Sequence, residues 1–203
     1  MPKHRLVYQS PICLSSNDHN ISIEQLLRIV GENSQAEFDS ETKNYYPQNE
    51  IILSTNGRRY RLHEYHFHRP GEHIIDGRKY PAEVHYLFVE LFSNGTIRSG
   101  RRDVCGGRCH TDENYFVIGR VISNSELPAP DLKNFPVRTP SIYFEYDGSL
   151  TTPPFDTAIR WAVGKNKIHL NLNSLTEVNS KGSRPIQNTN GRIILLANNT
   201  CNN

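Results

Sequence analysis

The chain has 203 residues, a length that suits one domain and that single all-β domains commonly reach. Its 23 lysines and arginines nearly balance 21 aspartates and glutamates, and the formal net charge is +2. This balance argues against a dedicated nucleic-acid or membrane-surface protein, whose basic patch should unbalance the total. No stretch approaches the ~18 apolar residues that a membrane span needs, and the first eight residues lack the apolar core of an export signal.

Cysteine usage slightly favours a reducing compartment such as the cytoplasm. A disulfide scaffold needs more cysteines at more regular spacing than the four present, which are Cys13, Cys105, Cys109 and Cys201. Three glycosylation triplets would matter only in an exported chain, and they begin at Asn20, Asn94 and Asn198. These features do not decide the compartment.

Taken in chain order, the predicted elements after a short arm at residues 1–8 are one helix and then mainly strands. The helix is predicted over Ser22–Val30, where four apolar residues share one helical face: Ile23, Leu26, Leu27 and Val30. Apolar or alternating runs bounded by Gly, Asn, Asp or Pro predict strands at Glu50–Leu53, Tyr60–Phe67, Ala82–Phe92, Tyr115–Ile122, Ile142–Tyr146, Ile168–Leu172 and Ile193–Ala197. A second short helix is predicted over Ser174–Val178, and residues 198–203 are expected to form a frayed tail. The pattern predicts a mainly β single domain over residues 1–203, with peripheral helices.

The segment from Tyr65 to His85 concentrates the residues that carry chemistry. Side chains alternate across a strand, so His66 and His68 point to one face while Tyr65 and Phe67 point to the packed opposite side. Two imidazoles therefore converge on one face of the predicted strand.

A third imidazole can join them from the next strand. Turn signals at Pro70-Gly71 and Asp76-Gly77 let the chain fold back and place Glu83 and His85 on a neighbouring strand, again on one face. Three neutral histidines with an open fourth position are typical of a catalytic zinc, which supplies hydroxide near neutral pH. Nearby glutamates suit the carboxylates that hold a ligating histidine by its other nitrogen. A His-x-His pair alone fits histidines bonded to backbone carbonyls equally well.

Two longer signatures favour the metal site. With the histidine segment, and with Tyr146-Asp147-Gly148-Ser149-Leu150-Thr151-Thr152-Pro153-Pro154 followed by Ile159-Arg160-Trp161, the chain resembles an α-carbonic anhydrase. The compact turn Arg69-Pro70-Gly71-Glu72-His73 is similar to the bacterial, plant and algal branch of that family. Further matches span most of the chain and are Gln9-Ser10-Pro11-Ile12, Phe116-Val117-Ile118-Gly119 and Ser183-Arg184-Pro185-Ile186-Gln187.

The resemblance implies reversible hydration of carbon dioxide to bicarbonate and a proton, on a zinc ion (Zn2+) bound by His66, His68 and His85. It implies that Thr151 accepts a hydrogen bond from the attacking hydroxide and donates its own to Glu72. It also implies a large, mostly antiparallel central sheet of about ten strands, with short helices outside and zinc at the floor of a conical cleft.

Further roles follow from the same resemblance. Glu64 and Glu83 would support the ligands His66 and His85, and His73 would pair with Tyr146 as a structural contact. The apolar pocket for carbon dioxide would be formed by Leu87, Val117, Leu150, Ile159 and Trp161, with Thr152 on its polar side.

Departures from the family pattern lead to further expectations. Relatives carry an aromatic-rich segment before the Gln-Ser-Pro motif, whereas only eight residues precede Gln9 here. An apolar strip left exposed by this difference could be covered by a second copy of the chain, so one hypothesis is a homo-oligomer. Ungapped alignment places Glu32 at the usual histidine proton-shuttle position, which predicts slower, more buffer-dependent proton export. Glu64 replaces a common glutamine, which would make His66 more basic. Phe155 replaces a cysteine of exported relatives, so their disulfide cannot form.

Three points stay open at this stage. The segment from Cys105 to Cys109 is expected to be a glycine-rich turn rather than a small bridge or second metal site, because its ligands fall short of four. A related fold could instead serve as a binding or adhesion module, in which the clusters Arg58-Arg59-Tyr60-Arg61 and Arg98 to Arg102 hold sulfated sugar. Ester hydrolysis is expected only as a side reaction.

Overall fold

The computed structural model describes residues 8–19, 21–31, 35–94, 96 and 115–200. Two short 3-10 helices, η1 (Leu132–Asn134) and η2 (Leu172–Ser174), accompany the strands there. The strands are β1 (Cys13–Leu14), β2 (Ile21–Gln25), β3 (Arg28–Val30), β4 (Ala36–Asp39), β5 (Asn44–Pro47), β6 (Ile52–Thr55), β7 (Arg58–His68), β8 (Ile74–Ile75), β9 (Arg78–Lys79), β10 (Ala82–Glu90), β11 (Tyr115–Asn124), β12 (Ile142–Ser149), β13 (Thr157–Leu170) and β14 (Ile194–Asn199). The prediction of a mainly β fold is confirmed.

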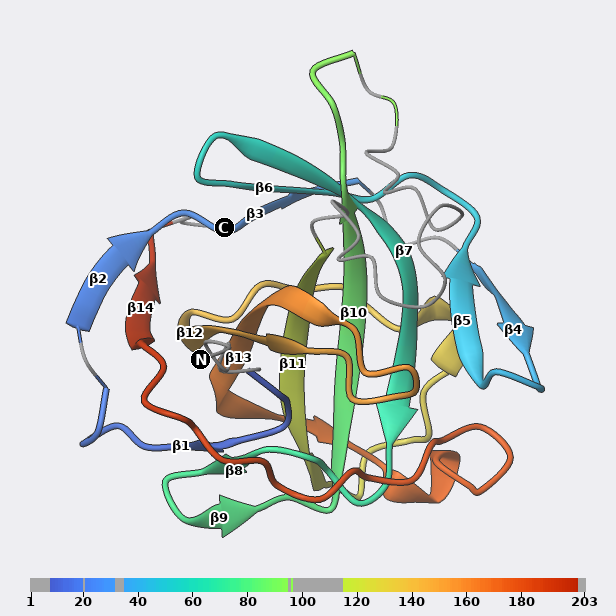
Figure 1. The fold of residues 1–203 in the computed structure, drawn as a ribbon. Coiled ribbons are helices and arrows are strands. Elements are labelled where there is room, and N and C mark those ends of the chain that lie inside the picture. The colour runs from blue at the N-terminus through green and yellow to red at the C-terminus, as the bar shows by residue number, and fades with distance from the viewer. Residues whose placement is uncertain (1–7, 20, 32–34, 95, 97–114, 201–203) are drawn as a thin grey trace.

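An eleven-stranded sheet dominates, with the order β2-β14-β12-β13-β11-β10-β7-β5-β4 and with β3 joined through β6 to β7. Most neighbouring strands are antiparallel, and the parallel pairs in this sheet are β11 with β13 and β14 with β2. The long strands β7, β10 and β11 stand side by side at its centre (Figure 1). A small sheet of β1, β8 and β9 lies at the lower left of that view.

The central strands bury both faces, so two apolar clusters form. On β7, Tyr65 and Phe67 pack into the larger cluster, while His66 and His68 point to the opposite face. The pairing register of β7 with β10 shifts between Leu62 and Glu64, so that His63 is the extra residue of a β-bulge. The expectation that alternation places His66 and His68 on the face opposite Tyr65 and Phe67 is confirmed.

The smaller cluster lies on the histidine face, and the first described segment of the chain packs into it. Ile12 and Leu14 are buried there beside Tyr146 and Trp161. The backbone N–H of Ser10 donates to Oγ of Ser149, at 2.9 Å. The signature Gln-Ser-Pro-Ile near the start of the chain therefore closes the floor beneath the β12–β13 connection.

The predicted helix over Ser22–Val30 is wrong, because this segment forms β2 and β3. The side chains that turn inward follow a period of two, not 3.6: Ile23, Gln25, Leu27 and Ile29 are buried or half-buried, whereas Leu26 and Val30 are 44% and 51% exposed. Gln25 can occupy an inward position because its amide donates to Glu145 Oε2 at 2.7 Å.

The remaining boundaries need smaller corrections. The helix predicted over Ser174–Val178 is absent from the described chain, where η2 ends at Ser174. Strand β13 begins at Thr157, eleven residues before the predicted start at Ile168. Asn198 and Asn199 extend β14 by pairing with β2, so they are not part of a frayed tail.

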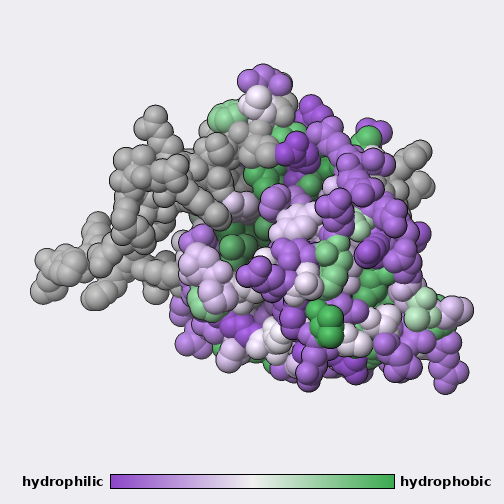
Figure 2. All heavy atoms as spheres, turned by 90° about the vertical axis from the view of Figure 1, so that its right-hand side faces the viewer, coloured by the Kyte–Doolittle hydropathy of each residue, from purple (hydrophilic) through white to green (hydrophobic). Residues whose placement is uncertain are grey.

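On the face that carries β4 and β5, hydrophilic side chains predominate and apolar ones show through in separate spots (Figure 2). No helix among the described residues is long and apolar enough to cross a membrane. The homo-oligomer stays a prediction.

Candidate metal centre

Three buried histidines converge on the face of the sheet opposite the larger core. His66 and His68 come from β7, and His85 stands directly opposite His66 on β10. The Nε2 atoms of His66 and His68 lie 3.0 Å apart, and ligand atoms of all three histidines lie within 4.8 Å of one another. The ring centroid of His85 is 5.3 Å from that of His66 and 4.7 Å from that of His68.

The other nitrogen of each imidazole is held by an acceptor. Oε2 of Glu64 lies 2.9 Å from Nδ1 of His66, and Oε1 of Glu83 lies 2.9 Å from Nε2 of His85. The carbonyl oxygen of Gly182 lies 2.8 Å from Nδ1 of His68. When these outer nitrogens carry the protons, the lone pairs of the inner nitrogens face one another, which is the state that binds a metal.

The electrostatics of the three rings differ. Burial lowers the pKa of His66 and His68 well below the ordinary value, so both are held neutral. Burial also acts to lower the pKa of His85, but the carboxylates around it, Glu83 first, raise the pKa above its usual range. A bound cation would compete with that proton, as metal binding to histidine generally does.

Glu83 anchors the layer beneath the ligands. Its Oε1 also lies 2.6 Å from Nδ1 of His73, and its Oε2 accepts the backbone N–H groups of Glu72 and His73, both at 2.8 Å. Burial alone would raise the pKa of Glu83, but His73 and His85 hold it well below the ordinary value. His73 in turn lies 2.6 Å from the hydroxyl of Tyr146 through Nε2.

Glu72 is a second buried carboxylate, set between the histidines and Thr151. Its Oε1 accepts the backbone N–H of Arg184 at 2.7 Å, and its Oε2 lies 3.9 Å from Nδ1 of His85. That Oε2 atom has no hydrogen bond of good geometry among the described residues. Burial raises the pKa of Glu72, whereas His85 and the nearby Thr151 hydroxyl act to lower it.

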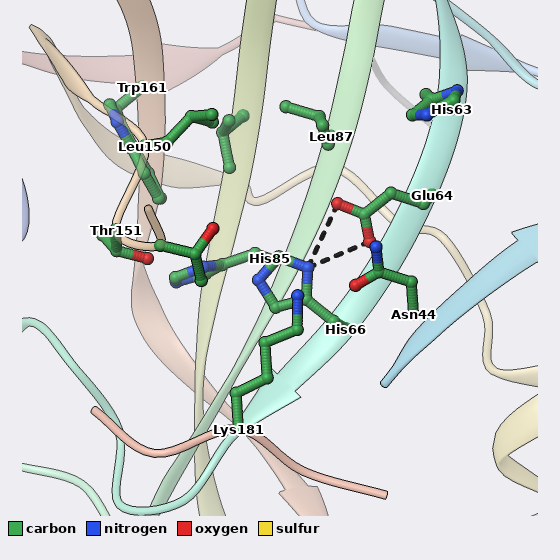
Figure 3. Close-up of a pocket in the computed structure, with 12 residues that line it drawn as sticks. Asn44, His63, Glu64, His66, His85, Leu87, Leu150, Thr151, Trp161 and Lys181 are labelled. Atoms are coloured by element: carbon green, nitrogen blue, oxygen red, sulfur yellow. Dashed lines mark hydrogen bonds and ion pairs between the residues drawn. The ribbon is translucent and has the colours of Figure 1, made fainter. Parts of the chain in front are cut away.

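A cavity of about 150 Å³ opens in front of the histidines (Figure 3). Its apolar wall consists of Leu87, Val117, Leu150 and Trp161. Its polar wall consists of Asn44, His63, Glu64 and Lys181, and Thr151 and Thr152 complete the lining with His66 and His85. Ile159 does not line the cavity and is fully buried in the cluster behind it.

Three residues of the polar wall are not predicted by any sequence pattern. Asn44 begins β5, His63 is the bulged residue of β7, and Lys181 lies in an irregular segment after β13. The bulge could have been found only from the pairing register, because His63 breaks the alternation that ends in His66 and His68.

Other predictions fall elsewhere. Glu32, the Arg98 to Arg102 cluster and the segment from Cys105 to Cys109 lie outside the described residues. The guanidinium carbon of Arg184 lies 3.9 Å from the ring centroid of Phe155. Arg58 forms an ion pair with Glu90 at 3.4 Å.

The residues present fit a zinc ion. Three nitrogen donors, each with its outer nitrogen next to an acceptor, and no fourth ligand in the part of the chain that the structure describes match the donor set of a catalytic zinc site. A second group of three, His73, Glu83 and His85, is explained by hydrogen bonds, since Oε1 of Glu83 bridges the two rings.

Comparison with known proteins agrees with this geometry. Residues 118–198 match the model of the eukaryotic-type carbonic anhydrase family. A carbonic anhydrase of Neisseria gonorrhoeae is 30% identical over 158 residues, which cover 74% of this chain and 61% of that protein. One from Pectobacterium carotovorum is 27% identical over 195 residues, which cover 88% of this chain and 79% of that protein.

The solved structures agree at the level of the fold. The α-carbonic anhydrase of Photobacterium profundum superimposes with a TM-score of 0.66 at 22% identity, covering 93% of this chain and 89% of that one. The family model, the relatives and the shared fold together show that the chain belongs to the α-carbonic anhydrase family.

Proposed function

We propose that this protein catalyses the reversible hydration of carbon dioxide to bicarbonate and a proton, with a zinc ion held by His66, His68 and His85. The observation that carries the proposal is the convergence of three buried imidazoles whose outer nitrogens are each held by an acceptor. Zinc in such a site supplies hydroxide at neutral pH by lowering the pKa of water, a property established for carbonic anhydrases themselves.

Thr151 and Glu72 would orient the nucleophile. One oxygen of Glu72 is occupied by the N–H of Arg184, and the other is buried near the Thr151 hydroxyl. A carboxylate in that position would take the hydrogen bond that Thr151 donates. The threonine oxygen would then be left to accept a hydrogen bond, which selects a hydroxide with one lone pair aimed at the substrate.

The apolar wall would receive carbon dioxide. Carbon dioxide is small and uncharged, so it needs a dry surface beside the nucleophile rather than a specific polar partner. Val117 and Trp161 are almost fully buried, at 2% and 1% exposure, and Leu87 and Leu150 pack against the same cluster. The narrow cavity favours this substrate over a larger ester.

Glu64 and Glu83 would be positioning residues. Each holds the outer nitrogen of one ligand and thereby sets its tautomer and its basicity. We further propose that residues 1–203 act as one domain, since the large sheet draws strands from both ends of the described chain.

The test is stopped-flow hydration of carbon dioxide on protein whose zinc content has been measured. The purified protein should carry one zinc per chain and accelerate hydration. Removal of the metal with dipicolinate should abolish the activity, and one equivalent of added zinc should restore it. Zinc-loaded, folded protein that hydrates carbon dioxide no faster than the buffer would contradict the proposal.

A further inference from the structure

Lys181 brings a cation into the cavity from a distant part of the chain. Its side chain extends from the segment below the histidines, and it lines the same cavity as His66 and His85 (Figure 3). No hydrogen bond or ion pair of its ammonium group with another described residue is present. An ammonium without a direct partner at a cavity wall is available to an anionic ligand.

The backbone holds this lysine in place. Its N–H donates to the carbonyl oxygen of Phe67 at 2.8 Å, and its carbonyl oxygen accepts the N–H of Arg69 at 2.9 Å. These two bonds form a bridge to His68 at the end of β7. Lys181 is therefore fixed beside the metal ligands, not attached to a freely moving loop.

Charged groups of both signs surround Lys181, and the pKa of its amine lies below the ordinary value. Its half-buried position lowers the pKa of the amine, whereas the carboxylates of Glu64 and Glu72 raise it and Lys43 lowers it. The carboxyl group of Glu64 contacts His66 and not the ammonium group of Lys181. The ammonium group of Lys43 donates to the carbonyl oxygen of Ser180.

Asn44 supplies a second unpaired polar group on the same wall. Its Nδ2 donates to the hydroxyl of Tyr46 at 3.2 Å. Its Oδ1 is buried and has no hydrogen-bond partner among the described residues. A buried carbonyl oxygen left without a donor is costly, so a ligand that carries an O–H group would stabilise it.

We propose that Lys181 and Asn44 form a subsite for bicarbonate, the anionic partner of the reaction. The ammonium would attract the charged oxygen, and Oδ1 of Asn44 would accept the single O–H of the ligand. This combination suits a protonated monovalent oxyanion better than an anion without a donor. The inference rests on the proposed function, because it places the anion next to the proposed metal ion.

The experiment measures anion binding at equilibrium, using protein loaded with cobalt(II) and the visible spectrum of the metal. Bicarbonate and thiocyanate are titrated, and neutral imidazole serves as an uncharged ligand of the metal. The variants are Lys181→Met, Lys181→Arg and Asn44→Leu. Lys167→Met is the matched control, because Lys167 is exposed on β13 and does not line the cavity.

The variants should distinguish the effect of the Lys181 charge from that of the hydrogen bond to Asn44. Lys181→Met should weaken both anions about tenfold, as expected for loss of one charge at a partly desolvated site, and leave imidazole within about twofold. Lys181→Arg should stay within about threefold of the wild type, because it keeps the charge. Asn44→Leu should weaken bicarbonate about fivefold, the worth of one hydrogen bond, and thiocyanate less than twofold.

The outcomes distinguish this subsite from the proposed function. Folded Lys181→Met protein that binds cobalt and both anions as tightly as the wild type would overturn the subsite, whatever the hydration rate. Anion binding that depends on Lys181, in zinc protein without hydration activity, would support the subsite and contradict the proposed function. A wild-type chain that binds no cobalt would overturn both.

Discussion

Oε1 of Glu83 lies 2.9 Å from Nε2 of His85, so the buried carboxylate of one residue fixes the orientation of the other. The same carboxylate accepts two backbone N–H groups through Oε2 and contacts His73 through Oε1. A single side chain thus joins the turn after β7, the third histidine and the floor of the site.

Replacing Glu83 with glutamine should weaken zinc binding about 10- to 100-fold, the usual effect of losing a group that supports a ligand. It should also lower the free energy of unfolding by about 2–4 kcal/mol, because an amide NH2 group cannot accept the bonds that a carboxylate oxygen accepts. Zinc affinity is measured by competition with a chelator, and stability by urea denaturation. Unchanged zinc affinity would show that Glu83 has only a packing role.

Glu64 should make the stability of the metal-free protein depend on pH. Burial raises the pKa of its carboxyl group from 4.5 to about 7 in the folded chain. The folded state therefore holds this proton more tightly than the unfolded state, and stability falls as pH rises from about 4.5 through about 7. Glu64→Gln should consequently raise the melting temperature of metal-free protein more at pH 8 than at pH 5. An equal shift at both pH values would contradict this assignment.

In the zinc-loaded protein, the same variant tests the tuning of His66. A carboxylate beside Nδ1 makes the imidazole a stronger donor to the metal, which raises the pH at which the attacking hydroxide forms. Glu64→Gln should therefore move the midpoint of the pH–rate profile to lower pH. A midpoint equal to that of the wild type would remove this role.

Thr151 and Thr152 provide a matched pair, since both line the cavity and only Thr151 affects the pKa of Glu72. Thr151→Val should lower kcat/KM for hydration about 10²-fold or more, with zinc content unchanged, because an orienting hydrogen bond is lost. Thr152→Val should have a much smaller effect. Equal losses in the two variants, measured by stopped flow, would argue against orientation by Thr151.

The histidine face was predictable because its information is local. The alternation of Tyr65, His66, Phe67 and His68 places two imidazoles on one side of β7, and the turns before His85 bring a third against them. The structure places His85 on that neighbouring strand, directly opposite His66.

Two parts of the structure were not predictable in this way. Lys181 reaches the cavity through a bridge to His68, across 113 positions in sequence, and no local pattern signals such a contact. The strands at Ile21–Gln25 and Arg28–Val30 were mistaken for a helix because the inward residue Gln25 is polar. Its burial is stabilised by hydrogen bonds to Thr55 and Glu145, which are distant in sequence. A polar residue at an inward position interrupts the apolar alternation that would have predicted a strand.

The central claim is tested most directly by comparing His85→Ala with His169→Ala, since His169 is exposed on β13 and does not line the cavity. Zinc content and carbon dioxide hydration are measured on the same folded samples. The three-histidine site predicts that His85→Ala loses both bound zinc and hydration, while His169→Ala keeps one zinc per chain and the wild-type rate. Retention of zinc and full hydration activity by His85→Ala would contradict it.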